Sequence, residues 1–409
     1  MENYKSKEYR YTAMVKSILA SCKILLFVLI ISNFISCSEN KIDKQQSKNE
    51  VKDRDNNKNN IGNIKKDSIK LTDFLKDNGY LSARTDSIFN TLSEGERVSQ
   101  MIIASYGELG KSKEQLTKLI AERKIGGVVI LKGESSVLKE QINFLESTAK
   151  QNGLLPLIFS CDAEPSLFNA KLRGSPKVTI ASNIKNEKES GEVSLKINRF
   201  IKDIGFKQNY APICDFDINK EIIGNRSFGH ESNIVTKLST KFIEICQEQG
   251  IVATAKHFPG HGTVKGDSHN SIVFIDGELK ELEVFSSVVK SGVISVMVGH
   301  IAVKNNKEYD TGGLPSTLSR KIVTDLLRTK LGFKGIIITD AMNMGAVTNF
   351  TTPSLNAVKA GCDLILMPTN EEALYESILA QMKNDAEFTK QVHESVKKII
   401  RLKICLGLL

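Results

Sequence analysis

The sequence predicts an α/β protein folded as a (β/α)8 barrel of the TIM type. Eight short apolar runs recur along the chain, and amphipathic segments with helical periodicity separate most of them. The runs are continuously apolar, as in parallel strands that are covered on both faces. Eight strand–helix units therefore favour a closed barrel. A doubly wound open sheet is the alternative, but no GxGxxG turn follows any of the runs to support it.

The first segment, residues 1–37, has the features of a secretory signal peptide. Lysines precede the apolar stretch Ile24–Ile31, which is too short to span a bilayer comfortably. The tetrad Phe34-Ile35-Ser36-Cys37 then resembles a bacterial lipobox, in which the cysteine becomes the lipid-modified first residue after cleavage. We therefore expect an exported lipoprotein, anchored through Cys37 on the periplasmic or cell-surface face of a membrane. An uncleaved signal anchor is the alternative.

The second segment, residues 38–70, has a different composition from the remainder of the chain. It contains no aromatic residue and is rich in Asn, Lys, Asp and Gln. Such a segment cannot bury enough apolar surface to offset the entropy lost on ordering, so we expect a disordered tether. Residues 71–409 are then expected to form one barrel domain that ends in C-terminal helices.

The overall composition is that of an ordinary globular protein, with 41% hydrophobic residues, 25% charged residues and no tryptophan. Much of the net charge of +9 lies in the first seventy residues, and no basic stripe with interleaved aromatics follows. This argues against nucleic-acid binding. The seven cysteines form no CxxC pair and show no metal-ligand spacing. We expect five of them to be small buried hydrophobes: Cys161, Cys214, Cys246, Cys362 and Cys405.

The barrel elements are expected in a regular order, beginning with a helix over Asp86–Arg97. The eight strands are predicted at Met101–Ser105, Val128–Leu131, Pro156–Asp162, Phe206–Pro212, Ile251–His257, Val293–His300, Gly335–Asp340 and Asp363–Pro368. Helices between them are predicted at Ser112–Lys124, Ser136–Lys150, Glu189–Ile204, Ile234–Gln249 and Leu279–Ser291. In such a barrel the active site lies at the carboxyl ends of the strands. The polar residues at those ends are Asp162, Lys256, His257, His300 and Asp340.

A glycine-rich loop, AKHFPGHGTVKGDSHNS at residues 255–271, holds three of the six histidines. Polar loops on strand ends are common sites of chemistry. His257 and His261 are four residues apart, a spacing that would suggest a metal pair on a helix. Pro259, Gly260 and Gly262 break any helix there, which excludes the zinc-protease arrangement.

Three motifs together resemble those of glycoside hydrolase family 3. They are KHFPGHG (256–262) followed by DSH (267–269), IIITDAM (336–342) and GNRSFG (224–229). Within that family they look like the single-domain bacterial β-N-acetylglucosaminidases, and the resemblance spans about Glu94 to Pro368. The combination of KHFPGHG with DSH is specific, whereas IITDAM alone would be weak. The family has the same barrel fold that the apolar runs predict.

The resemblance implies roles for seven residues and implies no metal or cofactor. Asp340 matches the nucleophile of a retaining mechanism. His269 matches the general acid/base, and Asp267 matches the partner that orients its ring. The residues that match sugar ligands are Asp162, Arg226, Lys256 and His257. The sequence departs from the family after Asp162, where D-A-E-P-S-L stands in place of a pattern close to D-Q-E-G-G-R.

The remaining histidines are not assigned to catalysis. His261 is expected to make structural hydrogen bonds in the turn, and His300 either lines the site or packs below it. His230 is expected near the pocket, and His393 is expected to face solvent on a C-terminal helix. The resemblance also implies a geometry: His269 and Asp340 should face each other across one sugar-sized pocket.

The leading hypothesis is an exo-acting β-N-acetylglucosaminidase that removes terminal N-acetylhexosamine from peptidoglycan fragments or other glycans. A β-glucosidase and a glycoside phosphorylase of the same family are alternatives, the latter because a histidine acid/base does not repel phosphate as a carboxylate would. A metal-dependent barrel hydrolase and a glycan-binding lipoprotein without activity are alternatives of other classes. The sequence does not predict the oligomeric state.

Overall fold

The computed structural model describes residues 69–409. The predicted signal peptide, Cys37 and nearly all of the predicted tether lie outside the described residues. Each predicted strand overlaps an observed one. The eight strands are β1 (Ile102–Tyr106), β2 (Gly127–Ile130), β4 (Ile158–Cys161), β6 (Gln208–Asn209), β7 (Val252–Phe258), β9 (Ser295–Val298), β11 (Ile336–Thr339) and β12 (Ile365–Leu366).

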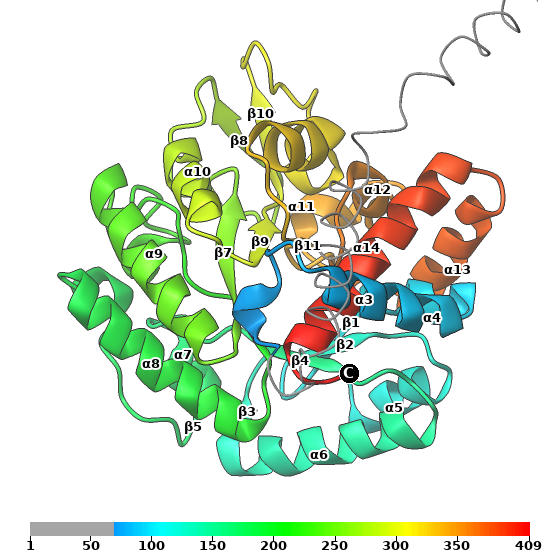
Figure 1. Cartoon of the computed structure of the whole chain (residues 1–409). Helices are drawn as coiled ribbons and strands as arrows, with labels where there is room; N and C mark the ends of the chain where they lie inside the picture. Colours follow the sequence, from blue (N-terminus) through cyan, green and yellow to red (C-terminus); the bar gives the residue numbers. More distant parts are fainter. Residues whose placement is uncertain (1–68) are drawn as a thin grey trace, which may run out of the picture. The chain divides into compact units, whose positions relative to one another are not determined.

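The eight strands are parallel and follow one another around a barrel in chain order. The sheet closes between β11 and β12 through a bridge that pairs Ile338 with Leu364. There the amide of Thr339 donates to the carbonyl of Leu364 at 3.1 Å. The predicted (β/α)8 barrel is therefore confirmed, and Figure 1 shows its helices arranged around the strands.

Helices cover the outside of the barrel. The longer ones are α5 (Lys113–Ala121), α6 (Ser135–Gln151), α8 (Glu187–Ile204), α9 (Ser232–Glu248), α10 (Leu282–Lys290), the π-type helix η6 (Lys321–Lys330), α12 (Pro353–Ala360), α13 (Glu371–Met382) and α14 (Ala386–Cys405). Short elements lie in the connections: η2 (Leu71–Asp73), β3 (Gly133–Glu134), α7 (Phe168–Lys171), β5 (Leu172–Arg173), η3 (Ala181–Asn183), η4 (Gly224–Arg226), β8 (Val273–Asp276), β10 (Ile301–Lys304), η5 (Ser316–Leu318) and α11 (Gly345–Thr348).

The prediction of one helix over Asp86–Arg97 was wrong, because the chain forms two helices there. These are α3 (Gly79–Thr91) and α4 (Glu94–Ser99). Leu92 between them is extended, with φ −89° and ψ 138°. Ser93 then caps α4: its hydroxyl accepts from the amide of Glu96, and the Glu96 carboxylate accepts from the amide of Ser93. This capping box starts a new helix where the apolar periodicity alone suggested a continuous one.

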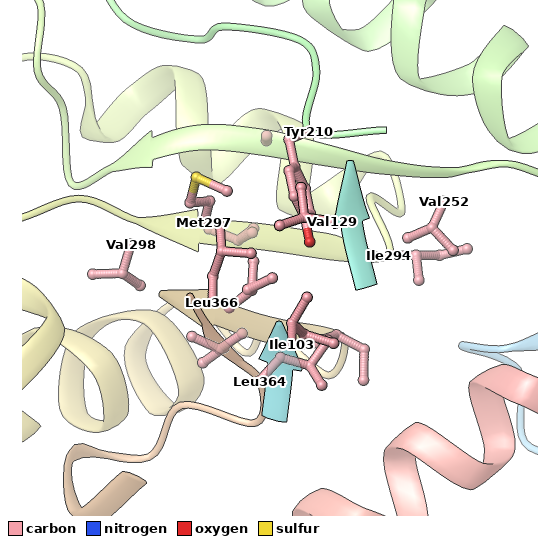
Figure 2. Close-up of a cluster of buried hydrophobic side chains, with 14 of the residues drawn as sticks. Ile103, Val129, Tyr210, Val252, Ile294, Met297, Val298, Leu364 and Leu366 are labelled. Atoms are coloured by element: carbon pink, nitrogen blue, oxygen red, sulfur yellow. The ribbon is translucent and has the colours of Figure 1, made fainter. Parts of the chain in front are cut away.

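Side chains fill the interior of the barrel. Figure 2 shows a cluster of buried apolar residues, of which the labelled members are Ile103, Val129, Tyr210, Val252, Ile294, Met297, Val298, Leu364 and Leu366. The hydroxyls of Ser160 and Tyr210 lie 2.8 Å apart, which satisfies the polar end of the tyrosine. In a barrel with such a packed interior, ligands bind at the carboxyl ends of the strands.

The five cysteines of the barrel domain are buried and unpaired, as predicted from the apolar runs around them. Within residues 69–409 we find no helix whose length and apolar character would let it cross a bilayer.

Candidate active site

A pocket of about 330 Å³ lies at the carboxyl ends of the barrel strands. Six of the seven residues assigned from the sequence line it, and Asp267 lies behind His269 as its hydrogen-bond partner. The six come from several loops and strand ends: Asp162, Arg226, Lys256, His257, His269 and Asp340.

Strand β7 supplies two adjacent residues to this pocket. In a regular strand, successive side chains point to opposite faces. The register of β7 against β9 shifts between Ala255 and Phe258, so the strand is irregular at this point. Lys256 and His257 both line the pocket as a result. The glycines of the KHFPGHG motif allow close packing, because a Cβ at Gly262 would lie 2.0 Å from the carbonyl oxygen of Phe216.

One wall of the pocket is a network of buried charges centred on Lys256. Its ammonium lies 2.6 Å from Asp162 and 3.2 Å from Glu164. Glu164 also binds the guanidinium of Arg226 with both oxygens, at 2.8 and 2.9 Å. Lys171 forms a second ion pair with Asp162. Bidentate and charge-assisted bonds of this kind are strong and hold the side chains in fixed positions.

This network keeps its members ionised. Burial alone would raise the pKa of Asp162, but Lys171, Lys256 and Arg226 hold that pKa well below its usual range. Burial would likewise lower the pKa of Lys256, but Asp162 and Glu164 raise it above its ordinary value. Each charge compensates for the desolvation of the other, so the pocket keeps fixed donors and acceptors near neutral pH.

His257 is oriented by a buried carboxylate that the sequence analysis did not identify. Its Nδ1 lies 2.7 Å from Asp215 Oδ2, and its backbone amide donates to the same carboxylate at 3.0 Å. Asp215 remains ionised, because His257 and His261 lower its pKa despite the opposing effect of burial. The carboxylate can only accept, so Nδ1 carries the proton and Nε2 is left for a ligand.

Asp340 directly follows β11 at the base of the pocket. Its amide donates to the carbonyl of Val298 at 2.9 Å, and its Oδ1 accepts from the amide of Ala341 at 2.8 Å. Burial would raise its pKa, but His257, His300, the bond from Ala341 and Lys256 together lower that pKa. Asp340 is therefore a carboxylate at neutral pH, the form that a nucleophile requires.

Asp267 and His269 form a hydrogen-bonded pair at the mouth of the pocket. Asp267 Oδ1 lies 2.6 Å from His269 Nδ1 and accepts from the His269 amide at 2.8 Å. Burial would raise the pKa of Asp267, but these two bonds lower it. The carboxylate can only accept, so Nδ1 carries a proton and Nε2 is free for proton transfer. The His269 side chain is 59% exposed, which leaves that nitrogen accessible.

The loop that carries this pair rests on the segment that follows Asp340. The amide of Gly345, at the start of α11, donates to the carbonyl of His269 at 2.8 Å. A Cβ at position 345 would lie 2.5 Å from the carbonyl oxygen of Asn270, so only glycine permits this approach. His269 and Asp340 thereby line the same pocket although 71 positions separate them in the sequence.

The four histidines left unassigned occupy different environments. His261 is buried, lines the pocket and bonds Ser268. His300 packs below the site, where Nδ1 meets Thr317 and Nε2 donates to the carbonyl of Ala341. His230 is exposed and pairs with Asp217, outside the pocket lining. His393 lies on α14, where its side chain is 27% exposed, bonds Glu94 and packs edge-on against Phe89.

The segment after Asp162 forms a pocket wall that differs from the one its motif suggested. The expected glycines and arginine are absent, but Glu164 keeps the glutamate of the D-Q-E pattern and binds Arg226. Lys171, from α7, returns a cation to this wall beside Asp162. Neither residue was assigned from the sequence. Glu164 could have been found by its place in the motif, whereas no spacing rule pointed to Lys171.

Potential metal ligands are dispersed in the structure. Among the residues from 69 onward, no three histidine, cysteine, aspartate or glutamate side chains converge in an arrangement that could hold a metal ion.

Residues 94–402 match the family model described as the glycosyl hydrolase family 3 N terminal domain. A beta-hexosaminidase A from Pseudoalteromonas piscicida is 28% identical over 329 residues, covering 71% of this chain and 55% of that protein. A protein from Cellulomonas fimi named beta-N-acetylglucosaminidase/beta-glucosidase is 26% identical over 355 residues, covering 82% of this chain and 61% of that protein. The chain thus spans somewhat more than half the length of these relatives.

A solved structure of a family 3 enzyme is also similar to this chain. The glycoside hydrolase family 3 beta-N-acetylglucosaminidase from a Paenibacillus species superimposes with a TM-score of 0.70 at 28% identity. The match covers 78% of this chain and 63% of that one.

Proposed function

The chain belongs to glycosyl hydrolase family 3, and from this we propose that it is a retaining exo-glycosidase that removes terminal β-linked N-acetylhexosamine. The observation that carries the proposal is the convergence of an ionised carboxylate, Asp340, and a carboxylate–histidine pair, Asp267 and His269, on one pocket. A volume of about 330 Å³ is at the low end for ligand sites and suits a single sugar, which favours exo action.

In the first step, an Asp340 oxygen attacks the anomeric carbon while the bond from that carbon to the aglycone oxygen breaks. Protonated His269 gives its Nε2 proton to the departing oxygen, and the bond to Asp267 stabilises the ring while it is charged. The product is a covalent glycosyl ester on Asp340 and a free alcohol.

In the second step, water enters from the side that the aglycone left. His269, now neutral, takes a proton from the water as its oxygen attacks the anomeric carbon. The ester bond to Asp340 breaks, the carboxylate is restored, and the sugar is released with its original configuration. The ring nitrogen ends protonated, as it began.

The charged wall is proposed to hold the sugar. The ammonium of Lys256 and the carboxylate of Asp162 offer a donor and an acceptor side by side, 2.6 Å apart, and vicinal hydroxyls can bond both. His257 adds a ring nitrogen that Asp215 orients. These contacts bind hydroxyl groups and do not by themselves select an N-acetyl substituent, so that part of the proposal rests on the names of the relatives.

The test is activity on a panel of 4-nitrophenyl β-glycosides, comparing N-acetylglucosaminide with glucoside and xyloside. We expect the N-acetylglucosaminide to be cleaved best and Asp340→Ala to abolish turnover, with Asp325→Ala on the exposed face of η6 as the matched control. Wild-type rates for Asp340→Ala would refute the assignment. A preference for the glucoside would instead indicate a β-glucosidase, the second activity in the name of the Cellulomonas fimi relative.

Two further outcomes separate the remaining alternatives. Formation of sugar 1-phosphate in phosphate buffer would indicate phosphorolysis, which a histidine acid/base permits. Sugar binding by calorimetry without cleavage over a day would indicate a binding protein. The sequence pattern before Cys37 supports the further proposal of export and lipid anchoring. Radiolabelled palmitate incorporation that is lost in Cys37→Ala would test it.

A further inference from the structure

The acid/base loop, residues 263–271, lies between β7 and β8, and hydrogen bonds to its backbone groups and to Gly262 hold it at both ends. On the β7 side, the Gly262 amide donates to Glu281 Oε1 at 2.9 Å. Asn219 then bonds the carbonyls of both Gly262 and Gly266, at 2.6 and 3.1 Å. On the far side, the Gly345 amide holds the carbonyl of His269. These contacts fix the path of the backbone.

One contact of the loop differs from these, because it joins two buried side chains, Ser268 in the loop and His261 just before it. The Ser268 hydroxyl lies 2.8 Å from His261 Nε2, and both residues are 1% exposed. Ser268 stands between Asp267 and His269 in the chain, and it lines the pocket together with His261 and His269. We call this hydrogen bond the Ser268–His261 contact.

The direction of this bond follows from the other ring nitrogen. His261 Nδ1 is buried and has no hydrogen-bond partner among the described residues. Burial and the neighbouring His257 lower the pKa of His261, so the ring is neutral. A buried N–H without an acceptor is rarer than an unused lone pair, which places the proton on Nε2. His261 therefore donates and Ser268 accepts.

Asp215 links the Ser268–His261 contact to His257, one of the proposed sugar ligands. The amide of His261 donates to Asp215 Oδ1 at 2.8 Å, and Asp215 Oδ2 holds Nδ1 of His257 at 2.7 Å. The rings of His257 and His261 pack edge to face with centroids 5.9 Å apart. A single buried carboxylate thus fixes both His257 and the residue that anchors Ser268.

We propose that Ser268 is a positioning residue, and that the Ser268–His261 contact sets the place of the Asp267–His269 pair relative to the bound sugar. This rests on the proposed glycosidase function. Without the contact, the hydrogen bonds to the backbone would still hold the loop. The position of the His269 ring relative to His257 would no longer be fixed. Proton transfer would suffer more than sugar binding, because small displacements of a catalytic group are costly.

The experiment compares two substrates that differ in their need for the acid. A 4-nitrophenyl N-acetylglucosaminide leaves with little protonation, whereas the methyl glycoside needs the proton from His269. For Ser268→Ala we expect kcat/KM to fall about tenfold or more on the methyl glycoside and less than about threefold on the nitrophenyl glycoside. Ser268→Thr keeps a hydroxyl and should recover most of the loss. Ser271→Ala, at an exposed position of the same loop whose side chain makes no hydrogen bond within residues 69–409, is the matched control and should behave as wild type on both substrates.

Equal losses on the two substrates, or no loss, would overturn the positioning role. The role would also be overturned if the fall in kcat/KM of Ser268→Ala came with a lower melting temperature and were not reversed in Ser268→Thr. These outcomes differ from failure of the proposed function, in which the wild type itself would cleave no glycoside in the panel.

Discussion

Lys403 is a lysine buried in the barrel wall, and replacing it with methionine should change how stability depends on pH. The residue lies on α14 and is fully buried. Its ammonium bonds Gln100 Oε1 at 2.5 Å and the carbonyl of Gly126 at 3.2 Å, and no carboxylate pairs with it in residues 69–409. Burial lowers its pKa from 10.5 to about 7.

The sign of the effect follows from proton binding. Between about pH 7 and 10.5 the unfolded chain holds a proton on Lys403 and the folded chain does not. Stability therefore rises with pH across this window, and the cost of burying the charge is complete only below about pH 7. That cost is about 5 kcal/mol, because each pKa unit corresponds to about 1.4 kcal/mol.

Between pH 6 and pH 9 we expect the free energy of unfolding of the wild type to rise by about 2.5 kcal/mol relative to that of Lys403→Met. The variant leaves the Gln100 and Gly126 oxygens without a donor, at about 1–3 kcal/mol each, so the absolute difference at one pH is less informative than its slope. Urea unfolding followed by far-UV circular dichroism measures it, since the chain has no tryptophan. Lys390→Met, exposed on the same helix, is the control. Parallel curves of free energy against pH for wild type and Lys403→Met would refute the reasoning.

Three further predictions concern the candidate site. Asp267→Asn should lower kcat about 100-fold or more with little change in melting temperature, because an amide orients the acid/base ring but does not stabilise its charge; steady-state kinetics would check this. Lys171→Ala removes one of two cations from Asp162 and should raise KM about fivefold with a smaller effect on kcat, whereas a change in kcat alone would contradict a binding role. Glu164→Gln leaves Arg226 without its buried counter-charge and should destabilise the fold by about 3 kcal/mol, and an unchanged urea midpoint would show that the pair is dispensable.

The barrel was predictable because its strands are buried on both faces. Runs such as the one that contains β11 are continuously apolar, a pattern that few other structures give. The parallel pair β8 and β10 was not predicted. The strand Val273–Asp276 alternates between buried and exposed residues, and its partner lies 28 positions later in the sequence. Short elements of this kind depend on tertiary contacts that local pattern does not encode.

The sequence predicted the motif residues of the candidate site. It did not predict the buried carboxylates that hold these residues in place. Asp340 and the Asp267–His269 pair stand in recognisable segments, and the structure brings them to one pocket. Asp215 and Glu281 lie in segments with no such motif. Their roles arise from pairings across 42 and 19 positions, with His257 and Gly262. Such partners become evident only when the strand ends meet.

Glu281 illustrates what these hidden partners do. It accepts from the amides of Phe216 and Gly262, and burial together with the nearby Asp215 raises its pKa to about 8. A carboxyl held so close to a second buried carboxylate is tolerated because it is largely protonated at neutral pH. It braces the start of the acid/base loop without adding a full charge beside Asp215.

We therefore expect the stability of the fold to depend mainly on the charged wall of the pocket and much less on the loop that carries Asp267 and His269. The wall around Lys256 is buried, and removal of one partner leaves an uncompensated charge, so its variants should lose stability as well as activity. Asp267 and His269 lie on an exposed loop, where an ion pair contributes at most about 1 kcal/mol to folding. Variants that fold normally but do not turn over should therefore cluster in the loop, and this separation makes the proposed acid/base pair testable apart from the fold.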